Sequence, residues 1–504
     1  MCSAVDRALA ILESLRKTGV RVNGLGTDSR TIAPGEIFLA YPGARTDGRR
    51  HIGAAIGRGA AAVLWEETGF EWDAAWRVPN FPVDDLRGLA GPLAHEVYRR
   101  PSEHLWMIGV TGTNGKTSCS HWIGQALTGA GRKTGVIGTL GSGFADVEGD
   151  LEPDPNTTPD AVLLHRKLAG FLRDGAEAAA MEVSSIGLDQ RRVEAVRFDI
   201  ALFTNLSRDH LEYHGDLESY ARAKMMLFRT PGLRHAVLNL DDALGVRIAQ
   251  SLQDSPVQRI GYSLTRGAGR RGGLERHLEA HDISLTDRGI AFALVSSWGD
   301  ARIESAMIGR FNVANLLGVL GVLLASGMTL DTAARTLGTL RPVPGRMQRF
   351  GGGDKPLVVV DYAHSPDALD KVLTAVAGMA RERGGRLLCV FGCGGERDHG
   401  KRPLMGEAAS RHADFVVVTS DNPRGEDPAE IIGEILPGVR AAHVVEPDRR
   451  AAIRVAVARS GPGDVIVVAG KGHEPYQEVA GVRLPFSDAA EVRAALEDAG
   501  ARHP

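Results

Sequence analysis

Short apolar runs alternate with helical patterns along most of the chain. A helical pattern over residues 5–15 comes first, and strand-like apolar runs follow at 37–40 and 62–65. From His104 to about Arg341 the order strand, loop, helix is repeated. Regular alternation of this kind predicts parallel sheets that carry helices on both faces.

The central part of the chain has the clearest pattern. Apolar runs at 106–110, 178–183 and 200–204 predict buried strands, and helical patterns cover 116–130 and the region near 161–172. Each run is short and bounded by turn residues, as expected for strands that are covered on both faces.

Two later segments of this part differ from the rest. Residues 283–296 and 301–308 alternate between apolar and polar side chains, which predicts antiparallel strands. The longest apolar stretch, residues 313–325, is typical of a buried helix. Residues 266–276 are rich in Gly and Arg and predict a solvated loop.

Strand–helix alternation resumes after a break at Pro342, Pro344 and Gly345, and Pro101 marks an earlier junction. The apolar runs of the last part lie at 358–360, 387–391, 415–418 and 465–468. The sequence therefore predicts an α/β protein with three domains, at 1–102, 103–341 and 342–504.

Composition narrows the class of protein. At 504 residues, with 43% hydrophobic and 24% charged residues, the chain has the profile of an ordinary multidomain globular protein. A net charge of −3 argues against a general nucleic-acid binder. The cysteines are too few for a disulfide framework, and Cys389 and Cys393 lack a second pair at zinc-site spacing. No signal peptide and no apolar run of about 20 residues is present, so we expect a cytoplasmic enzyme without membrane insertion.

The most informative motif is the phosphate-binding loop, Val110 to Ser118, between a predicted strand and a predicted helix. Its glycines let backbone N–H groups turn toward phosphate oxygens, and the following helix N-terminus favours negative charge. Lys116 can reach terminal phosphates, and the Thr117 hydroxyl can ligate Mg²⁺. Val110 stands where glycine is usual, and a glycine turn without ligand is the alternative. The Gly-Lys-Thr ending favours a nucleoside triphosphate.

Further candidates follow the next two predicted strands. Glu182 ends one strand. It is either a Mg²⁺ ligand or a structural carboxylate whose hydrogen bonds are made within the protein. His210 could ligate a metal with Asp209 orienting its imidazole, whereas His214 is interpreted as structural. Lys224 lies in a helical pattern beside apolar residues, and from the residues alone we interpret it as a lysine that lies over apolar surface with its ammonium in solvent.

Polar clusters follow four predicted strands of the last part. They are 361–364, 392–398, 421–424 and 470–474. Arginine grips a carboxylate through two hydrogen bonds, and Glu474 would hold an ammonium, so the set suits a zwitterionic substrate. Any one cluster alone could be ordinary turn chemistry.

These residues resemble the Mur ligases, ATP-dependent amide-bond-forming enzymes of peptidoglycan precursor synthesis. The run 111–117 is similar to that family's phosphate loop, which accounts for Val110, and 27–30, 35–40 and 47–50 resemble its first domain. The resemblance covers essentially the whole chain. It implies a UDP-substrate-binding domain at 1–102, a central ATP-binding domain with a P-loop-type, mostly parallel sheet, and a C-terminal Rossmann-like α/β domain that binds the amino acid.

The resemblance also implies site residues. The catalytic residues would be Lys116, Lys224, Glu182 and His210. ATP would meet Gly112, Thr113, Asn114, Gly115, Lys116, Thr117, Asn315, Arg346 and Asp361. The UDP-muramoyl dipeptide would contact Ser29, Thr157, Thr158, Ser184, Gln190 and Arg192. Mg²⁺ would be held by Thr117, Glu182, His210 and a Lys224 carbamylated by CO₂, which replaces the solvent-facing interpretation of that lysine.

The amino acid is indicated by Asp421, Asn422, Pro423 and Arg424. In this family that run goes with meso-2,6-diaminopimelate, whose far carboxylate Arg424 would clasp; lysine, lacking that group, would leave the arginine unpaired. Arg397, Gly470 and Glu474 complete the implied amino-acid site. Ile186 stands where the resembled sequences usually have histidine, so the resemblance implies no histidine role at this position. The implied enzyme is a monomer that phosphorylates the substrate's D-glutamate carboxylate and then joins it to the amino acid.

Overall fold

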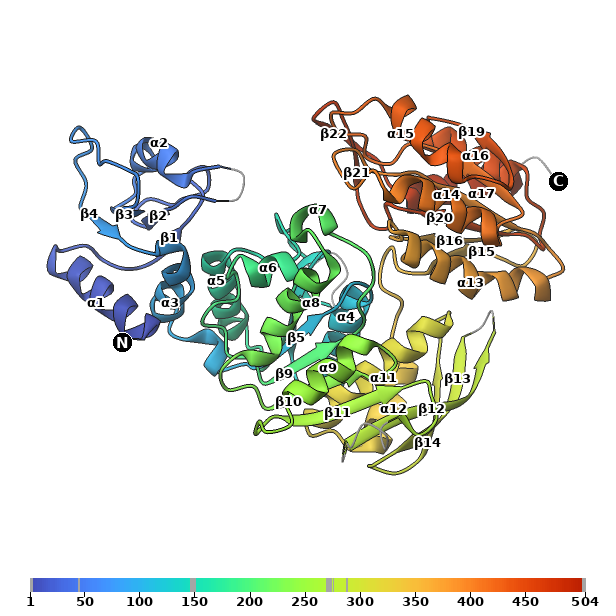
Figure 1. The fold of residues 1–504 in the computed structure, drawn as a ribbon, viewed down its shortest axis with the longest axis horizontal. Helices are drawn as coiled ribbons and strands as arrows, with labels where there is room; N and C mark the ends of the chain where they lie inside the picture. The colour runs from blue at the N-terminus through green and yellow to red at the C-terminus, as the bar shows by residue number, and fades with distance from the viewer. Residues whose placement is uncertain are drawn as a thin grey trace.

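The computed structural model describes residues 3–43, 46–145, 151–268, 274, 276–286 and 289–500. Three sheets, each made from one continuous stretch of chain, organise the molecule (Figure 1). Part of the predicted loop at 266–276 lies outside the described residues. No helix in the described ranges is both long and apolar enough to cross a bilayer.

The first sheet has four parallel strands in the order β1-β2-β3-β4. Its elements are α1 (Ala4–Lys17), β1 (Leu25–Gly26), β2 (Ile37–Ala40), α2 (Ile52–Gly57), β3 (Ala62–Glu66), β4 (Asn80–Val83) and α3 (Leu86–Val97). The core on the α1 and α3 side also contains Ala161 and Val162 from α5 (Ala161–Arg173), which belongs to the next part of the chain. On the same helix Arg166 forms an ion pair with Glu36 at 2.7 Å, and its Nε donates to the Tyr98 hydroxyl at 3.0 Å. Thus α5 completes the first core.

The central sheet has ten strands in the order β14-β13-β12-β11-β10-β9-β5-β8-β6-β7. It is parallel from β12 to β6, and β7, β13 and β14 are antiparallel. The strands are β5 (Trp106–Thr111), β6 (Thr134–Gly138), β7 (Gly141–Phe144), β8 (Ala178–Glu182), β9 (Ile200–Phe203), β10 (His235–Asn239), β11 (Gln258–Ser263), β12 (Arg276–Leu285), β13 (Ile290–Ser296) and β14 (Ala301–Ser305). The predicted run 283–296 is therefore two paired strands and not one.

Helices cover both faces of the central sheet. On one face α4 (Lys116–Gly129) and α11 (Arg310–Ala325) pack in one apolar core, with α12 (Leu330–Thr339) beside them. On the other face α5 and α9 (Ala243–Ser251) share a second core. The short helices α6 (Ser185–Asp189), α7 (Leu211–His214) and α8 (Leu217–Met225) follow the ends of β8 and β9. The helical pattern around Lys224 forms α8, and the chain continues from it as a 3₁₀ turn at Met226–Arg229.

The third sheet has six strands in the order β15-β16-β20-β17-β18-β19, and only β15 is antiparallel among its described neighbours. The strands are β15 (Gln348–Gly351), β16 (Leu357–Asp361), β17 (Leu387–Phe391), β18 (Phe415–Val418), β19 (Ala442–Val445) and β20 (Val465–Ala469). One face carries α13 (Pro366–Glu382), α14 (Lys401–His412) and α15 (Pro428–Ile435), and the other carries α16 (Arg449–Ala458) and α17 (Asp488–Gly500). A hairpin, β21 (Tyr476–Val479) and β22 (Val482–Pro485), follows β20.

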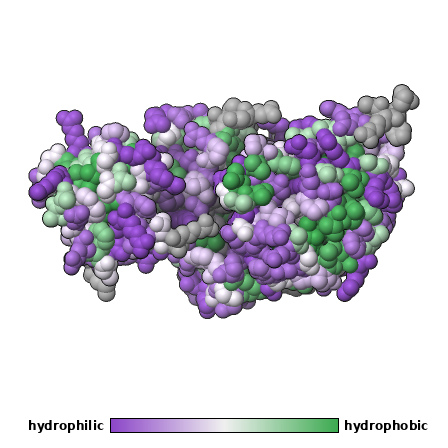
Figure 2. Space-filling model, turned by 90° about the horizontal axis from the view of Figure 1, so that it is seen from above, coloured by the Kyte–Doolittle hydropathy of each residue, from purple (hydrophilic) through white to green (hydrophobic). Residues whose placement is uncertain are grey.

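The predicted class, three α/β domains with parallel-rich sheets, is confirmed by these three sheets (Figure 1). The exact boundaries at 102 and 341 stay predictions. Seen from above, the surface has a hollow with largely hydrophilic walls between the N-terminal part, at the left, and the rest of the molecule (Figure 2).

Candidate active site

The phosphate-binding loop joins the end of β5 to the start of α4. Gly112 has φ +149° and Gly115 has φ +88°, conformations that side-chain-bearing residues rarely adopt. A Cβ on Gly115 would lie 2.6 Å from Asn315 Oδ1, so the loop and α11 approach closely there. The Asn315 amide in turn donates to Asn312 Oδ1 at 3.0 Å. The loop is thus a tight strand-to-helix turn that leaves no room for a side chain at its glycine positions.

Two lysines converge on one backbone oxygen of this loop. Lys116 Nζ donates to Gly112 O and to Thr113 O, both at 2.9 Å. Lys224 Nζ, from α8, donates to the same Gly112 O at 2.8 Å. Burial, followed by the nearby Lys116 charge, lowers the pKa of Lys224 well below its usual range. Its amine is therefore driven toward the uncharged form.

Lys224 has no ammonium in solvent, since the residue is 1% exposed. Its nitrogen lies 4.1 Å from the centre of the Tyr220 ring, and the Tyr220 hydroxyl lies 3.2 Å from Thr113 Oγ1. The solvent-facing interpretation of Lys224 is therefore wrong. The helical pattern alone could not distinguish it from burial, because it does not show what packs against α8.

Thr117 and Glu182 supply oxygen atoms near the loop. Thr117 Oγ1 accepts a hydrogen bond from Arg346 Nη2 at 3.1 Å. Glu182 is 1% exposed and accepts hydrogen bonds from Thr139, at 2.7 Å from the backbone N–H and 3.2 Å from the hydroxyl. A Cβ on Gly138 would collide with the Glu182 carboxylate, so this glycine makes room for it.

Thr117 and Glu182 are suitable Mg²⁺ ligands, but an unmodified Lys224 is not. Hydroxyl and carboxylate oxygens are ligands that Mg²⁺ accepts together with phosphate oxygens, whereas a lysine amine is not. Within the described ranges no group of three or more His, Cys, Asp and Glu side chains could hold a metal by itself. A metal at Thr117 and Glu182 therefore needs further oxygen ligands, which a nucleotide or a carbamate on Lys224 would supply.

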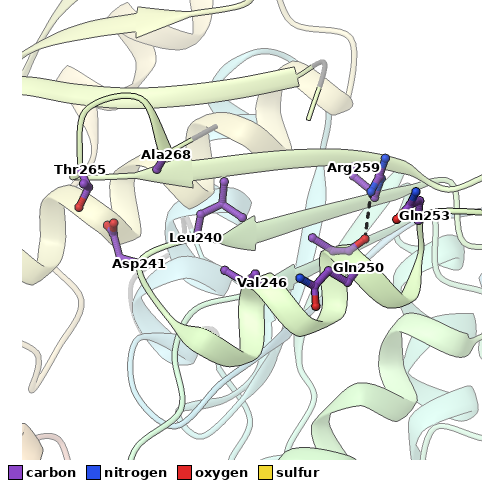
Figure 3. Close-up of a pocket in the computed structure, with 9 residues that line it drawn as sticks. Leu240, Asp241, Val246, Gln250, Gln253, Arg259, Thr265 and Ala268 are labelled. Carbon is purple, nitrogen blue, oxygen red and sulfur yellow. Dashed lines mark hydrogen bonds between the residues drawn. The ribbon is translucent and has the colours of Figure 1, made fainter. Parts of the chain in front are cut away.

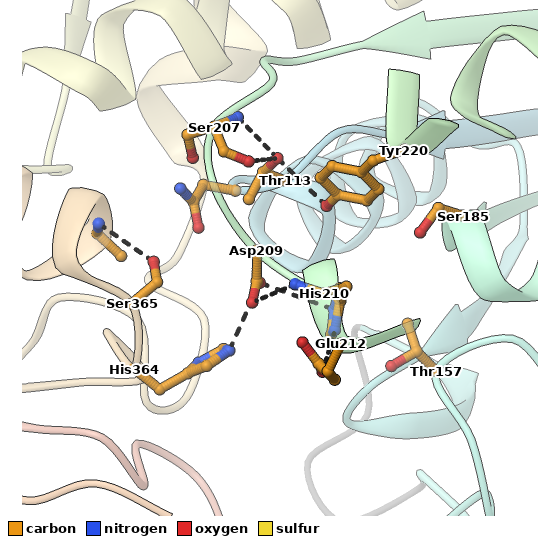
Figure 4. Close-up of polar contacts among 12 residues, drawn as sticks. Thr113, Thr157, Ser185, Ser207, Asp209, His210, Glu212, Tyr220, His364 and Ser365 are labelled. Carbon is orange, nitrogen blue, oxygen red and sulfur yellow. Dashed lines mark hydrogen bonds and ion pairs between the residues drawn. The ribbon is translucent and has the colours of Figure 1, made fainter. Parts of the chain in front are cut away.

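His210 belongs to a polar group that links the central and C-terminal parts (Figure 4). Its Nε2 lies 3.7 Å from Asp209 Oδ2, and its Nδ1 lies 3.6 Å from Glu212 Oε1. Asp209 Oδ2 also lies 3.9 Å from His364 Nε2, which follows β16. The Tyr220 ring lies 6.2 Å from the His210 ring and also contacts Lys224, so it stands beside both candidate ligands.

His214, which we interpret as structural, faces the start of α6. Its Nε2 lies 3.0 Å from Ser185 Oγ, and its ring packs against Tyr213 and Tyr220. Ile186 is half-buried on α6.

Five of the six residues predicted to bind the UDP substrate form a connected cluster beside Glu182. Thr157 Oγ1 lies 3.1 Å from Thr139 Oγ1, and Thr158 Oγ1 donates to Glu182 O at 2.9 Å. Ser184 joins the cluster because its hydroxyl accepts a hydrogen bond from Thr158 Oγ1. Arg192 and Gln190 join it because Arg192 donates from Nη1 to Thr158 O and from Nη2 to Gln190 Oε1. The sixth, Ser29, is buried after β1 in the first sheet.

Two predicted nucleotide contacts lie where the chain enters the third sheet. Arg346 stacks over the Tyr362 ring at 4.4 Å and reaches Thr117, as above. Asp361 ends β16 and accepts a hydrogen bond from Met347 N at 2.8 Å; burial raises the pKa of this carboxyl. Asn114 Nδ2 donates to Asp367 Oδ2 in the first turn of α13 at 3.1 Å. The loop is therefore tied directly to the C-terminal part.

The predicted amino-acid site lies at the carboxyl edge of the third sheet. Asn422 Nδ2 donates to Glu474 Oε2 at 2.7 Å. Gly470 has φ +116°, and a Cβ there would collide with the Asp421 carboxylate. Arg424, which follows Pro423, has φ +54° and donates from Nη1 to Gly395 O at 2.7 Å. The segments after β17, β18 and β20 are thus brought together.

Arg397 is exposed on the loop that Arg424 holds through Gly395. The hairpin β21–β22 is attached to the same edge, because Arg424 N donates to Glu478 O at 3.0 Å. Gln477 Nε2 also donates to Asp421 O at 2.7 Å. The hairpin therefore borders the amino-acid site.

Sequence reasoning gave no individual role to three buried or bridging residues. Lys471 donates to Asn422 and Glu474, and Arg449 is paired with Asp488 with both side chains fully buried. Asp367 holds Asn114, as described above. A signal existed for Lys471, since it lies in the polar cluster 470–474 after a fully apolar run; Arg449 and Asp367 gave none.

A cavity of about 540 Å³ lies elsewhere on the central part, between α9, β10 and β11 (Figure 3). Leu240, Asp241, Gln250 and Arg259 are among the residues that line it, and Arg259 Nη1 donates to Ala249 O at 3.0 Å. None of the predicted site residues lines this cavity.

Comparison with known proteins places the chain among enzymes of one family. The profile described as the Mur ligase middle domain matches residues 110–323, the Mur ligase, glutamate ligase domain matches 345–472, and the Mur ligase family, catalytic domain matches 21–98.

Curated relatives and a solved structure share one printed name. The UDP-N-acetylmuramoyl-L-alanyl-D-glutamate–2,6-diaminopimelate ligase of Janthinobacterium sp. (strain Marseille) is 50% identical over 479 residues, which is 94% of each chain. The protein of that name from Pseudomonas aeruginosa is 50% identical, over 94% of this chain and 95% of its own. A solved structure of such a ligase is 38% identical, with a TM-score of 0.65 over 96% of each chain.

Proposed function

The chain belongs to the Mur ligase family, and we propose on this basis that it is an ATP-dependent ligase of peptidoglycan precursor synthesis. It adds meso-2,6-diaminopimelate to the D-glutamate of UDP-N-acetylmuramoyl-L-alanyl-D-glutamate. Relatives with this name match nearly the full chain at about half identity.

The observation that carries the choice of amino acid is the arrangement of Arg424. The guanidinium nitrogen Nη1 donates to Gly395 O at 2.7 Å and lies 3.5 Å from Asn422 O. The other terminal nitrogen, Nη2, makes no hydrogen bond to any described residue. A ligand carboxylate at this partly buried site could accept from the free nitrogen through a charge-assisted hydrogen bond. The far carboxylate of meso-diaminopimelate supplies that group, and lysine does not.

The first chemical step transfers the terminal phosphoryl group of ATP to the D-glutamyl carboxylate and forms an acyl phosphate and ADP. Lys116 and the backbone N–H groups of the loop would face the phosphates and reduce the charge that develops on their oxygens. An uncharged amine of diaminopimelate then attacks the acyl carbon. A tetrahedral intermediate forms, phosphate leaves and the amine proton is released. No side-chain nucleophile is required.

We assign one Mg²⁺ position to Thr117 and Glu182 and a second to His210 and Lys224. Bound Mg²⁺ supplies charge neutralisation at the phosphoryl oxygens. The Lys224 environment favours the modification that this second position needs: an uncharged amine attacks CO₂, an N–C bond forms, a proton leaves, and the carbamate carries oxygen ligands. Arg346 donates to Thr117 Oγ1 at 3.1 Å, so its guanidinium lies beside the first position, where it would also face the phosphates of a bound nucleotide.

Each of the three parts of the chain would bind a different substrate or part of a substrate. Residues 1–102 hold the UDP portion with Ser29, residues 103–341 hold ATP and the dipeptide, and residues 342–504 hold the amino acid. The acyl phosphate forms in the central part, so the C-terminal part must close on it to exclude water and deliver the amine. We further propose that the protein works as a cytoplasmic monomer on small-molecule substrates.

The test is phosphate release by the full chain with ATP, Mg²⁺, the UDP-muramoyl dipeptide and a panel of amino acids. We expect turnover with meso-diaminopimelate and little with L-lysine or D-alanyl-D-alanine. A preference for lysine or D-alanyl-D-alanine would identify another ligase of the same family. Phosphate release that does not depend on any amino acid would contradict the ligase assignment.

A further inference from the structure

Lys471 is a fully buried cation at the edge that carries Asn422 and Glu474. Its Nζ donates to Asn422 Oδ1 and to Glu474 Oε2, each at 2.9 Å. Asn422 Nδ2 donates to the same glutamate oxygen at 2.7 Å. The three side chains therefore form a closed ring of hydrogen bonds that contains one positive and one negative charge.

This ring fixes the orientation of the Asn422 amide. Its Oδ1 accepts both from Lys471 and from Glu478 N, the latter at 2.9 Å, while its Nδ2 donates to the carboxylate. Exchanging the amide oxygen and nitrogen would face donors with donors. Asn422 therefore has one satisfied orientation.

The ring also distinguishes the two oxygens of Glu474. Oε2 receives Lys471 and Asn422, whereas Oε1 accepts no hydrogen bond from the described part of the chain. The side chain is 17% exposed, so Oε1 can face a ligand at the edge. Oε1 is therefore the oxygen of Glu474 that can accept a hydrogen bond from the ammonium group of a ligand.

A second buried cation near this ring, Arg449, already has its own partners. It pairs with Asp488 at 2.8 Å and donates from Nη2 to Ala469 O at 2.9 Å. Without Lys471, Glu474 would lose its cation and Asn422 Oδ1 one of its donors in a largely dry place, where unpaired polar groups are costly.

We propose that Lys471 is a positioning residue for the amino-acid substrate, which holds Asn422 and Glu474 so that Glu474 Oε1 meets an ammonium group of the diamino acid. This inference rests on the proposed function, because it takes this edge as the amino-acid site. The side-chain hydrogen bonds of Lys471 within the described residues go to Asn422 and Glu474, so we expect its effect to fall on the amino acid.

The experiment measures initial rates of phosphate release by full-length Lys471→Met while each substrate is varied. We expect the KM for meso-diaminopimelate to rise about tenfold or more, the effect of roughly one hydrogen bond to a charged group. The KM for ATP and for the UDP substrate should stay within about twofold. Lys471→Arg, which keeps the cation, should recover part of the loss.

Arg386→Met is the matched control, because it breaks an ion pair with Asp464 just before β20, at the opposite end of the strand from Lys471. It should lower thermal stability and leave the KM for the amino acid unchanged. If Lys471→Met does not fold, Lys471→Gln is measured with the same expectation.

A folded variant with an unchanged KM for meso-diaminopimelate, or with equal rises for all three substrates, would overturn the proposal. Since Lys471 acts through Glu474, the pair Lys471→Met with Glu474→Gln should bind the amino acid no worse than Glu474→Gln alone. If the two substitutions raised the KM for meso-diaminopimelate independently, so that their effects added, Lys471 would not act through Glu474. If the unaltered protein shows no diaminopimelate-dependent turnover, the proposed function fails; if it turns over and only the variant disagrees, the Lys471 role alone fails.

Discussion

Replacing Arg424 with lysine tests the choice of amino acid most directly. Arg424 holds Gly395 O at 2.7 Å through Nη1, which leaves Nη2 for the far carboxylate of the substrate. A lysine ammonium is a single point charge and cannot serve both partners with the same planar geometry. Losing one hydrogen bond between charged groups costs about 1.5–3 kcal/mol. The kcat/KM for meso-diaminopimelate should therefore fall roughly 10- to 150-fold.

The assay is phosphate release with the amino acid and ATP varied in turn. The KM for ATP should change by less than about twofold, because Arg424 has no hydrogen bond to the nucleotide-binding residues. Arg483→Lys, on the neighbouring strand β22, is the control and should behave like the unaltered protein. Equal losses for both substrates, or none for the amino acid, would refute the reasoning.

Three further predictions use other groups. Lys116→Ala should abolish ATP-dependent phosphate release without changing the circular dichroism spectrum, and unchanged release would contradict its role. Lys224→Ala should be inactive and partly restored by added short carboxylates such as acetate, whereas full activity without them would exclude a carbamate. Burial lowers the pKa of His165 to about 3, so the folded state takes up its proton less readily than the unfolded state. Stability to urea should fall as pH drops below about 6.5, by at most about 1.4 kcal/mol per pH unit from this group, and His165→Leu should flatten that slope; an unchanged slope would contradict it.

Much of the fold could be predicted because the parallel strands are buried on both faces. The runs at 387–391 and 465–468 are fully apolar, and they form β17 and most of β20. The run 283–296 was harder, since period-two alternation continues on both sides of the turn between β12 and β13. Alternation shows which face a residue occupies, but it does not show where the chain reverses.

Candidate site residues could be proposed from the sequence where they are consecutive, and their roles stay predictions. The loop 110–118 and the run 421–424 each place several polar groups at one strand end, so their sequence alone indicates a ligand. Contacts between distant segments gave no such signal. Lys224 reaches Gly112 O from α8, and Lys471 reaches Asn422 from the segment that follows β20. Those pairs depend on strand order, which a single sequence does not specify.

The position of α5 has a consequence for how the chain folds during synthesis. The first sheet is made entirely before residue 102, yet Ala161 and Val162 close its core and Arg166 pairs with Glu36. A nascent chain that has emerged only through β4 and α3 therefore exposes an apolar face that awaits a later helix. The first sheet should therefore complete its core only after α5 has left the ribosome, and a fragment ending at residue 102 should be less stable than the same sheet within the full-length chain.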